Sequence, residues 1–336
     1  MRLLLAPMEG VADFVLRDVL TAIGGYDLAV SEFVRVSGTL LPRRMFERIC
    51  PEILAGSRTA AGTPVAVQLL GSDPVLLAEN AARLAALSPH GIDLNFGCPA
   101  KVVNRHGGGA MLLDRPRLLH DIAAAVRAAV PAAIPVSAKM RLGIADPSRA
   151  LDCAQALADG GAQAIVVHAR TREQGYRAPA HWEWVARIGD AVRVPVTANG
   201  EVWSVRDWAR CREVSAAEDV MIGRGAVSDP WLARRIRGER GTEPDERDWV
   251  DLHPHLLRYW EGVQGRAAPV HACGRLKLWL GMLRRNYPAA GRLHEAVRRV
   301  VHPSRMNEEL RRHGIPACDH PPSARADGPR PTSPDR

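Results

Sequence analysis

The sequence predicts an α/β protein, a (β/α)8 TIM barrel followed by a small C-terminal helical domain. Three observations support this fold class. Short apolar runs recur eight times within the first 225 residues, segments of helical periodicity separate most of them, and the strand-like pattern stops after residue 238. An open doubly wound sheet is the alternative, but eight strand–helix units match the arithmetic of a closed barrel.

The eight runs are continuous rather than alternating, which is typical of parallel strands that are covered on both faces. In order, they occupy residues 2–8, 27–34, 65–71, 91–97, 136–143, 164–170, 194–200 and 219–225. Between them, helical periodicity is clearest at residues 73–87 and 115–130. We therefore predict a barrel over residues 1–238.

The chain after residue 238 changes character. Residues 238–248 are polar and rich in turn-forming residues, and helical patterns then cover 253–263, 273–287 and 293–301. We predict a helical domain over residues 239–313. Residues 314–336 are rich in proline and polar residues, so we expect a disordered tail.

Composition limits the class of protein. The chain has 336 residues and is 46% hydrophobic, without the run of ~20 apolar residues that a membrane span needs. Its N-terminus lacks a cleavage-site pattern, so we expect a cytoplasmic protein that does not bind membranes. We also expect a monomer. The six cysteines lack C-x-x-C spacing, and we expect no disulfide framework and no metal site.

Positive charge dominates and is made almost entirely of arginine. The net charge is +8, which fits a polyanionic partner but is also common in basic enzymes that never meet nucleic acid. Of 45 basic residues only Lys101, Lys139 and Lys277 are lysine, which leaves 42 arginines (45 − 3). Either these lysines stand where a compact ammonium is required, or lysine occurs there by chance in a chain that otherwise uses arginine.

Polar residues gather at the ends of the predicted strands, where barrels of this kind carry their chemistry. They are Glu9, Glu32, Arg35, Gln68, Asn95, Cys98, Lys139, Arg141, His168, Arg170, Asn199, Glu201 and Arg224, and Pro7, Met8, Gly200, Gly223 and Gly225 stand beside them. The glycines after the last two strands, with Arg224, predict a phosphate site, although tight turns alone would also use glycine.

Three strand-end residues have open roles from the sequence alone. Lys139 could be a Schiff-base nucleophile, half of an ion pair or a cation facing an anionic ring. His168 could be a hydrogen-bonded core residue. Cys98, between Gly97 and Pro99, is either a buried inert thiol or a general acid or nucleophile beside a glycine-rich loop that could admit a bulky substrate.

Eight ordered motifs resemble the tRNA-dihydrouridine synthase family across residues 3–310. They are A-P-M-E-G-V-A-D, E-F-V-R, V-Q-L-L-G, D-L-N-F-G-C-P-A-K-V-V with G-G-G-A, K-M-R-L-G, H-A-R-T-R-E-Q-G-Y, A-N-G-E and M-I-G-R-G-A. The resemblance implies FMN bound in the barrel mouth, NADPH as the electron donor, and reduction of the C5–C6 bond of uridines in tRNA.

The resemblance also implies residue roles. Pro7, Met8 and Glu9 would lie against the flavin, Gln68 and Lys139 would contact its polar edge, and His168 would lie nearby. The ribityl phosphate would be held by Asn199, Gly200, Glu201, Gly223 and Arg224. Cys98 would be the proton donor, and a thiol with pKa near ~8.5 does remain largely protonated at neutral pH.

Two stretches, E-F-V-R-V and R-L-K-L-W, most resemble the bacterial subfamily C, which modifies position 16 of the D-loop. That likeness implies tRNA contacts at Arg35, Asn95, Tyr176, Arg275, Lys277 and Arg298. Three other classes stay open: a flavin barrel that reduces a small molecule, such as a dihydroorotate dehydrogenase or ene-reductase; an RNA-binding protein without catalysis; and a Schiff-base aldolase using Lys139.

Overall fold

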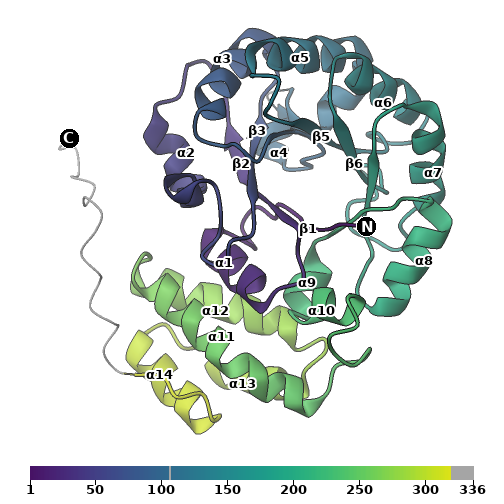
Figure 1. Ribbon diagram of the computed structural model, residues 1–336. Helices are drawn as coiled ribbons and strands as arrows, with labels where there is room; N and C mark the ends of the chain where they lie inside the picture. The colour runs from purple at the N-terminus through teal and green to yellow at the C-terminus, as the bar shows by residue number, and fades with distance from the viewer. Residues whose placement is uncertain (106, 319–336) are drawn as a thin grey trace. The chain divides into compact units, whose positions relative to one another are not determined.

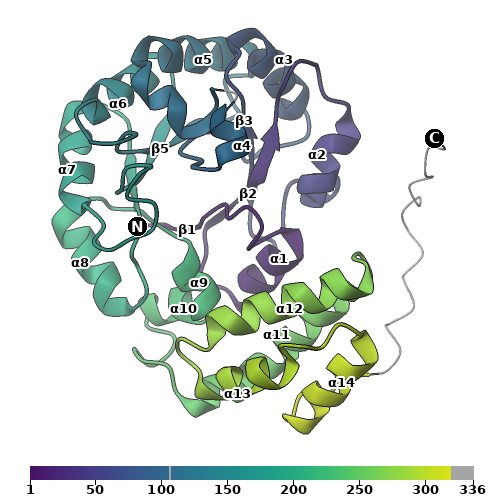
Figure 2. The ribbon, with the colours of Figure 1, turned by 180° about the vertical axis from the view of Figure 1, so that it is seen from behind.

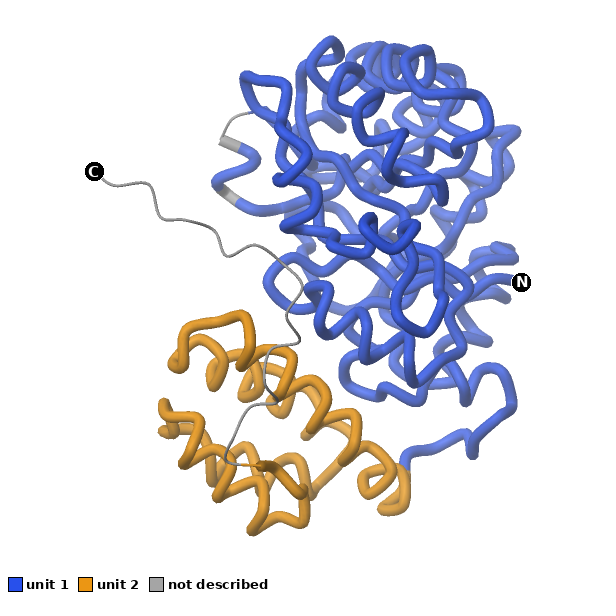
Figure 3. The backbone as a smooth tube through the Cα atoms, turned by 60° about the vertical axis from the view of Figure 1, so that its left-hand side comes forward, with its two compact units in different colours: residues 1–244 blue, residues 245–336 orange. Residues whose placement is uncertain are grey.

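The computed structural model describes residues 1–105 and 107–318. The chain divides into two compact units, Met1–Pro244 and Asp245–Arg336 (Figure 3). The first unit extends past residue 238, the boundary expected from the sequence, because the buried Arg235 contacts the segment that follows this boundary. Its guanidinium donates to the carbonyls of Gly241 and Glu243, at 2.7 and 3.0 Å, and holds that polar segment on the barrel unit.

The first unit is a closed barrel of eight parallel strands in sequence order (Figures 1 and 2). The strands are β1 (Leu3–Leu5), β2 (Leu28–Arg35), β3 (Val65–Leu70), β4 (Ile92–Phe96), β5 (Val136–Arg141), β6 (Ala164–His168), β7 (Val196–Asn199) and β8 (Val220–Ile222). β8 pairs with β1 to complete the ring. The predicted fold class is therefore confirmed, and each of the eight apolar runs coincides with one strand, with β2 extending one residue beyond its run.

Helices surround the strands (Figures 1 and 2). They are α1 (Phe14–Ile23), α2 (Arg43–Ile49), η1 (Pro51–Ala55), α3 (Pro74–Ala85), α4 (Lys101–Arg105), η2 (Gly109–Asp114), α5 (Pro116–Ala129), α6 (Ala150–Asp159), α7 (Trp182–Ala191), α8 (Val205–Ser215), α9 (Arg224–Ser228) and α10 (Leu232–Ile236). Local sequence sets several starts: Asp13, Asp73 and Ser204 accept hydrogen bonds from the first-turn amides of α1, α3 and α8.

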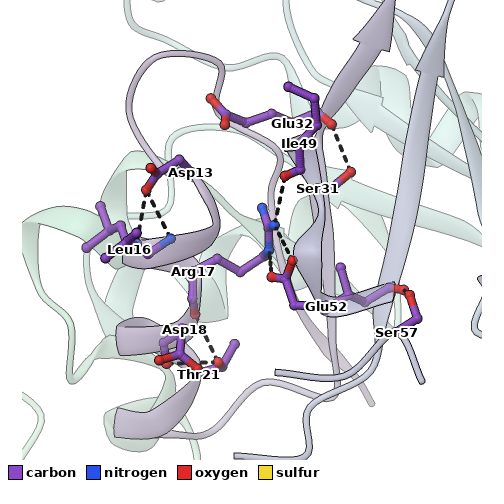
Figure 4. A network of polar contacts seen from close by, with 12 residues as sticks. Asp13, Leu16, Arg17, Asp18, Thr21, Ser31, Glu32, Ile49, Glu52 and Ser57 are labelled. Carbon is purple, nitrogen blue, oxygen red and sulfur yellow. Dashed lines mark hydrogen bonds and ion pairs between the residues drawn. The ribbon is translucent and has the colours of Figure 1, made fainter. Parts of the chain in front are cut away.

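One buried ion pair ties α1 to η1 beside β2 (Figure 4). The Arg17 Nε and Nη2 atoms donate to the two carboxylate oxygens of Glu52, at 2.7 and 3.0 Å. Both side chains are buried, at 1% and 8% exposure. Removing one partner of such a pair costs about 3–5 kcal/mol, because the other charge stays buried and unpaired.

The strand register brings the predicted polar residues together. Asn95 pairs with Lys139 across β4 and β5, and His168 pairs with Arg141 on one side and Asn199 on the other. Because all eight strands run in the same direction, their carboxyl ends meet at one end of the barrel. The site residues at that end come from distant parts of the chain.

The second unit is helical. Its helices are α11 (Glu246–Gln264), α12 (Pro269–Leu283), α13 (Pro288–Val297) and α14 (Pro303–Arg312). Asp245 and Asp248 form a capping box at the start of α11, and the buried rings of Tyr259 and Trp279 meet edge to face at 4.8 Å.

The disordered tail expected from residue 314 lies outside the described residues except for residues 314–318. Those five belong to the folded unit: Ile315 and Ala317 are buried, and Asn307 donates to the Cys318 carbonyl at 2.8 Å. The expectation failed for these five residues because it rested on the average composition of residues 314–336, which is polar although Ile315 and Ala317 are apolar. In the described part of the chain, no helix combines the length and apolar character that crossing a membrane requires.

Candidate active site

A cavity of about 470 Å³ lies among the carboxyl-end loops of the barrel unit. Every residue predicted for catalysis or flavin binding lines it, as do two predicted for tRNA. These lining residues are Pro7, Met8, Glu9, Gln68, Asn95, Cys98, Lys139, His168, Tyr176, Asn199, Gly200, Glu201, Gly223 and Arg224. The volume suits a cofactor-sized ligand.

Lys139 projects from β5 into the interior of the barrel. Its ammonium donates to the Asn199 side-chain oxygen at 3.0 Å, and Asn199 in turn donates to the Met221 carbonyl at 2.8 Å. Burial lowers the pKa of Lys139 to about 8, with the Arg141 charge acting in the same direction and Asp93 opposing it. The amine is therefore charged at neutral pH but loses its proton more readily than an ordinary lysine.

His168 ends β6 and packs against Gly200. Burial lowers the pKa of the imidazole well below its ordinary value, and the charges of Arg141 and Lys139 add to the effect. The ring is therefore neutral at pH 7. Gly200 has φ +114°, and a Cβ there would lie 2.9 Å from the His168 Cδ2 atom, so only glycine fits.

The turns after β7 and β8 lie in contact with each other. A Cβ on Gly225 would stand 2.0 Å from the Val202 carbonyl oxygen, so the two backbones meet with no room for a side chain. Trp182 donates to the Gly200 carbonyl at 2.9 Å and holds the first turn. Bare backbone beside the Arg224 guanidinium is a donor set that suits a phosphate.

Arg224 is stacked between two aromatic rings. Its guanidinium carbon lies 4.5 Å from the Tyr176 ring centroid and 5.1 Å from that of Trp203. The guanidinium of Arg141 lies 5.3 Å from the Tyr176 centroid. These cation–π contacts bring a residue predicted to bind phosphate against one predicted to meet tRNA.

Cys98 is fixed by its backbone on both sides. Its N–H donates to the Asn95 Oδ1 atom at 2.9 Å, and its carbonyl accepts from the Asn104 Nδ2 atom at 2.8 Å and the Ala110 N–H at 3.1 Å. The thiol packs in an apolar cluster with Leu70. Burial raises the pKa of Cys98, so the thiol keeps its proton at neutral pH and is suited to donate it.

The lining residues that the sequence analysis gave no role include Phe33, Arg141, Arg170 and Trp203. Arg141 is 2% exposed and donates to the Gly97 carbonyl at 2.8 Å. Arg170 forms an ion pair with Glu201. The sequence does give a signal for the two arginines, because each stands two positions after a predicted site residue. Arg141 lies on the same face of β5 as Lys139, whereas Arg170 lies just beyond the end of β6. Trp203 lies in a turn without such periodicity.

The other predicted tRNA residues do not line the cavity. Arg35 ends β2, while Arg275, Lys277 and Arg298 belong to the helical unit. Lys277 has a contact that the sequence did not predict: its ammonium donates to the carbonyls of Arg298 and Val300, at 3.3 and 2.9 Å, and so caps the end of α13. Arg298 pairs with Glu295 at 3.1 Å.

Among residues 1–105 and 107–318, no group of three or more His, Cys, Asp or Glu side chains is arranged to hold a metal ion.

Solved structures share the barrel. An old yellow enzyme homologue from Zymomonas mobilis is 14% identical, with a TM-score of 0.51, over 74% of this chain and 92% of its own. A 2-naphthoyl-CoA reductase is 13% identical, with a TM-score of 0.54, over 71% of this chain and 50% of its own. At such low identity these similarities support the fold alone.

Sequence relatives are far more similar. The tRNA-dihydrouridine(16) synthase of Ralstonia nicotianae is 66% identical over 299 residues, covering 89% of this chain and 92% of the relative. That of Aquipseudomonas alcaligenes is 56% identical over 311 residues, covering 92% and 99%. The family model described as Dihydrouridine synthase (Dus) matches residues 4–310. The resemblance read from the motifs is thus confirmed, and the chain belongs to the dihydrouridine synthase family.

Proposed function

We propose that this protein reduces uridine 16 in the D-loop of tRNA to 5,6-dihydrouridine, with FMN bound in the cavity, NADPH as the electron source and Cys98 as the proton donor to C5. The family establishes a flavin-dependent oxidoreductase that acts on tRNA. The observation that carries the residue assignment is the protonated Cys98 thiol, held at the wall of a cavity whose cations suit an anionic cofactor.

The cavity fits the cofactor by its donor set. Gly200, Gly223 and Arg224, with the backbone of Asn199 and Glu201, would hold the phosphate, because their turns bring bare backbone and a guanidinium together. The pyrimidine edge of the ring system would face Gln68, Lys139 and His168, and Pro7, Met8 and Glu9 would flank it. When bound and reduced, the flavin supplies the hydride that reaches C6 of the uracil.

The protein's own residues handle the resulting charge. Hydride addition at C6 places negative charge on C5 and O4, which a proton delivered to C5 removes. Cys98 supplies that proton from its Sγ atom. Its buried surroundings favour the neutral thiol before the reaction, and the nearby guanidinium of Arg141 lowers the cost of the thiolate afterwards.

Substrate binding involves both units in this proposal. Arg35, Asn95 and Tyr176 of the barrel unit, and Arg275, Lys277 and Arg298 of the helical unit, would contact the tRNA. An excess of eight positive charges suits the phosphate backbone. A uridine must leave its stack to reach Cys98, and the exposed ring of Tyr176, 55% accessible, is placed beside the cavity for such a base. We propose a cytoplasmic monomer.

The test is reconstitution of the reaction. Purified protein with FMN and NADPH is incubated with unmodified tRNA transcripts, and dihydrouridine is mapped by nuclease digestion and mass spectrometry. We expect a gain of two mass units at position 16 and no gain with a transcript that carries cytidine there. Absence of dihydrouridine, together with NADPH-dependent reduction of a small enone or of orotate, would instead support a small-molecule reductase.

A further inference from the structure

A chain of hydrogen bonds runs inside the barrel from a buried carboxylate to the turn that carries Cys98. Asp93, 1% exposed, lies on β4 directly between Gln68 on β3 and Ser137 on β5. Its Oδ2 atom accepts from the Gln68 Nε2 atom at 2.6 Å, and its Oδ1 atom accepts from the Ser137 hydroxyl at 2.6 Å. Asp93 does not line the cavity.

The chain continues toward the proton donor. The Gln68 Oε1 atom accepts from the Asn95 Nδ2 atom at 2.7 Å. The Asn95 Oδ1 atom then accepts from the N–H groups of Gly97 and Cys98, at 3.0 and 2.9 Å. Two side-chain amides therefore connect the carboxylate of Asp93 with the backbone of Cys98.

The donor-to-acceptor direction of this series of hydrogen bonds is fixed at both of its ends. The Asp93 oxygen facing Gln68 accepts whether the carboxyl group is ionised or carries its proton on the side of Ser137. The backbone N–H groups at the other end can only donate. Each amide between them has one orientation that satisfies both neighbours, and reversing either would place two donors or two acceptors face to face.

We propose that Asp93 is a positioning residue for the proton donor: by orienting the Gln68 amide, and through it the Asn95 amide, it holds the turn that places Cys98. The Asn95 amide then makes structural hydrogen bonds, which restrict how it can contact tRNA. The effect on catalysis rests on the proposed role of Cys98, whereas the effect on the turn does not.

Hydrogen bonding and charge can be separated, because an asparagine side chain at position 93 satisfies the chain in one orientation. Its carbonyl must face Gln68 and its NH₂ must face Ser137, whose hydroxyl can then accept. Asp93→Asn should be tolerated because Ser137 can still accept from the introduced NH₂ group. Ser137→Ala should be tolerated because the Asp93 carboxylate still accepts from Gln68. The double variant removes the acceptor that the introduced amide requires, and Asp93→Ala leaves the Gln68 NH₂ group without a partner.

The experiment uses the full-length, FMN-loaded protein. Iodoacetamide labelling of Cys98 at pH 8 is followed by peptide mass spectrometry, which separates it from the other cysteines. We expect labelling rates within about threefold of wild type for the two single variants. Asp93→Ala and Asp93→Asn/Ser137→Ala should each label about tenfold faster, because a released turn exposes the thiol and lowers its pKa.

A second readout is the single-turnover oxidation of the reduced flavin by tRNA. The double variant should be about tenfold slower than Asp93→Asn, a comparison in which the charge at position 93 is the same. Asp93→Asn is isosteric and Ser137→Ala removes a single heavy atom, so the double variant provides a test should Asp93→Ala fail to fold. Faster labelling without any tRNA reaction in the wild type would support the positioning inference and reject the proposed function.

Asp229→Ala is the matched control. Asp229 is equally buried, is paired with Arg235 at 2.8 Å, and does not line the cavity. We expect this variant to lose stability while the labelling of Cys98 stays unchanged. The inference is overturned if Asp229→Ala accelerates labelling as much as Asp93→Ala does, or if the double variant equals the product of its two singles.

Discussion

The barrel mouth and the helical unit both carry positive charge, but they hold it in opposite ways. In the mouth, Arg141 is buried and the Lys139 ammonium lies inside the barrel; desolvation lowers the pKa of each, and the Arg141 charge lowers that of Lys139 further. In the helical unit, Arg298 is half-exposed and paired with Glu295. Desolvated charges at fixed positions suit one small anion, whereas solvated charges on long side chains suit an extended polyanion.

This contrast shows that an arginine-rich composition does not by itself identify a binding surface. Lys139 and Lys277 are two of three lysines in the chain, and in both the ammonium is engaged by oxygen acceptors. Yet the first acceptor lies within the cavity and the others are carbonyls beyond the end of a helix. The following predictions, from the largest expected effect to the smallest, test the contrast.

The largest effect is expected at the proton donor. Cys98→Ala should slow uridine reduction by about 10²–10⁴-fold, the usual contribution of a positioned general acid, while flavin binding and flavin reduction by NADPH stay close to normal. Rapid-kinetic measurement of the two half-reactions separates these steps. Cys153→Ala, a buried cysteine on α6, is the control. Full tRNA turnover in Cys98→Ala would exclude the proton-donor role.

The next effect compares the two lysines directly. Lys139→Arg keeps the charge but enlarges a partly buried side chain that lines the cavity and donates to Asn199, so FMN affinity should fall by about tenfold or more. Lys277→Arg should leave it unchanged, because its acceptors lie at a partly exposed helix end. Fluorescence titration of the apoprotein with FMN measures both. Equal affinities for wild type and Lys139→Arg would show that the mouth does not need a compact ammonium.

In the helical unit the change should be smaller and depend on salt. Arg275→Ala and Arg298→Ala should each weaken tRNA binding and reduce the slope of log K against log[salt] by about one unit per lost phosphate contact. Filter binding across a salt titration gives the slopes. Arg305→Ala, an exposed arginine of α14 paired with Glu308, is the control. An unchanged slope in both variants would mean that these arginines are solvent-exposed side chains that do not contact tRNA phosphates.

The smallest effect concerns an acidic side chain at the barrel mouth. Glu32 accepts the Gly10 N–H at 2.8 Å, and burial raises its pKa from 4.5 to about 7, with Glu9 and Asp13 adding to the shift and Arg17 opposing it. Between these pH values the folded protein keeps a proton that the unfolded chain has lost, so this group's contribution to stability falls as pH rises through that window.

Glu32→Gln should therefore raise Tm by roughly 2–6 °C at pH 8 and by much less at pH 5. Thermal unfolding at the two pH values checks this difference. Glu218→Gln, at an exposed carboxylate, is the control. A Tm gain that is equal at both pH values would assign the effect to packing rather than to ionisation.

The fold could be predicted because it depends on patterns repeated along the chain. Eight continuous apolar runs alternating with helices leave few topologies, and strand-end residues such as Lys139 and Asn199 then had to meet. The motifs added the family, which periodicity alone could not supply.

Other features could not be predicted from the sequence, because they depend on contacts between segments that are distant along the chain. Asp93 reads as part of an apolar strand, and only the register with Ser137 and Gln68 reveals its partners. The capping role of Lys277 depends on how α13 ends, and Trp203 reaches the cavity from an irregular turn. No spacing rule connects such residues, because their contacts cross between separate segments.

The stacking of Arg224 on Tyr176 has a thermodynamic consequence. Under the proposed roles, one side chain is shared by the cofactor phosphate and the loop that meets the RNA. Any rearrangement of Arg224 on flavin binding then changes the free energy of tRNA binding. Reciprocity requires tRNA to change flavin affinity by the same factor. The two ligands, which meet during hydride transfer, are in that case already coupled at equilibrium, before any electron moves.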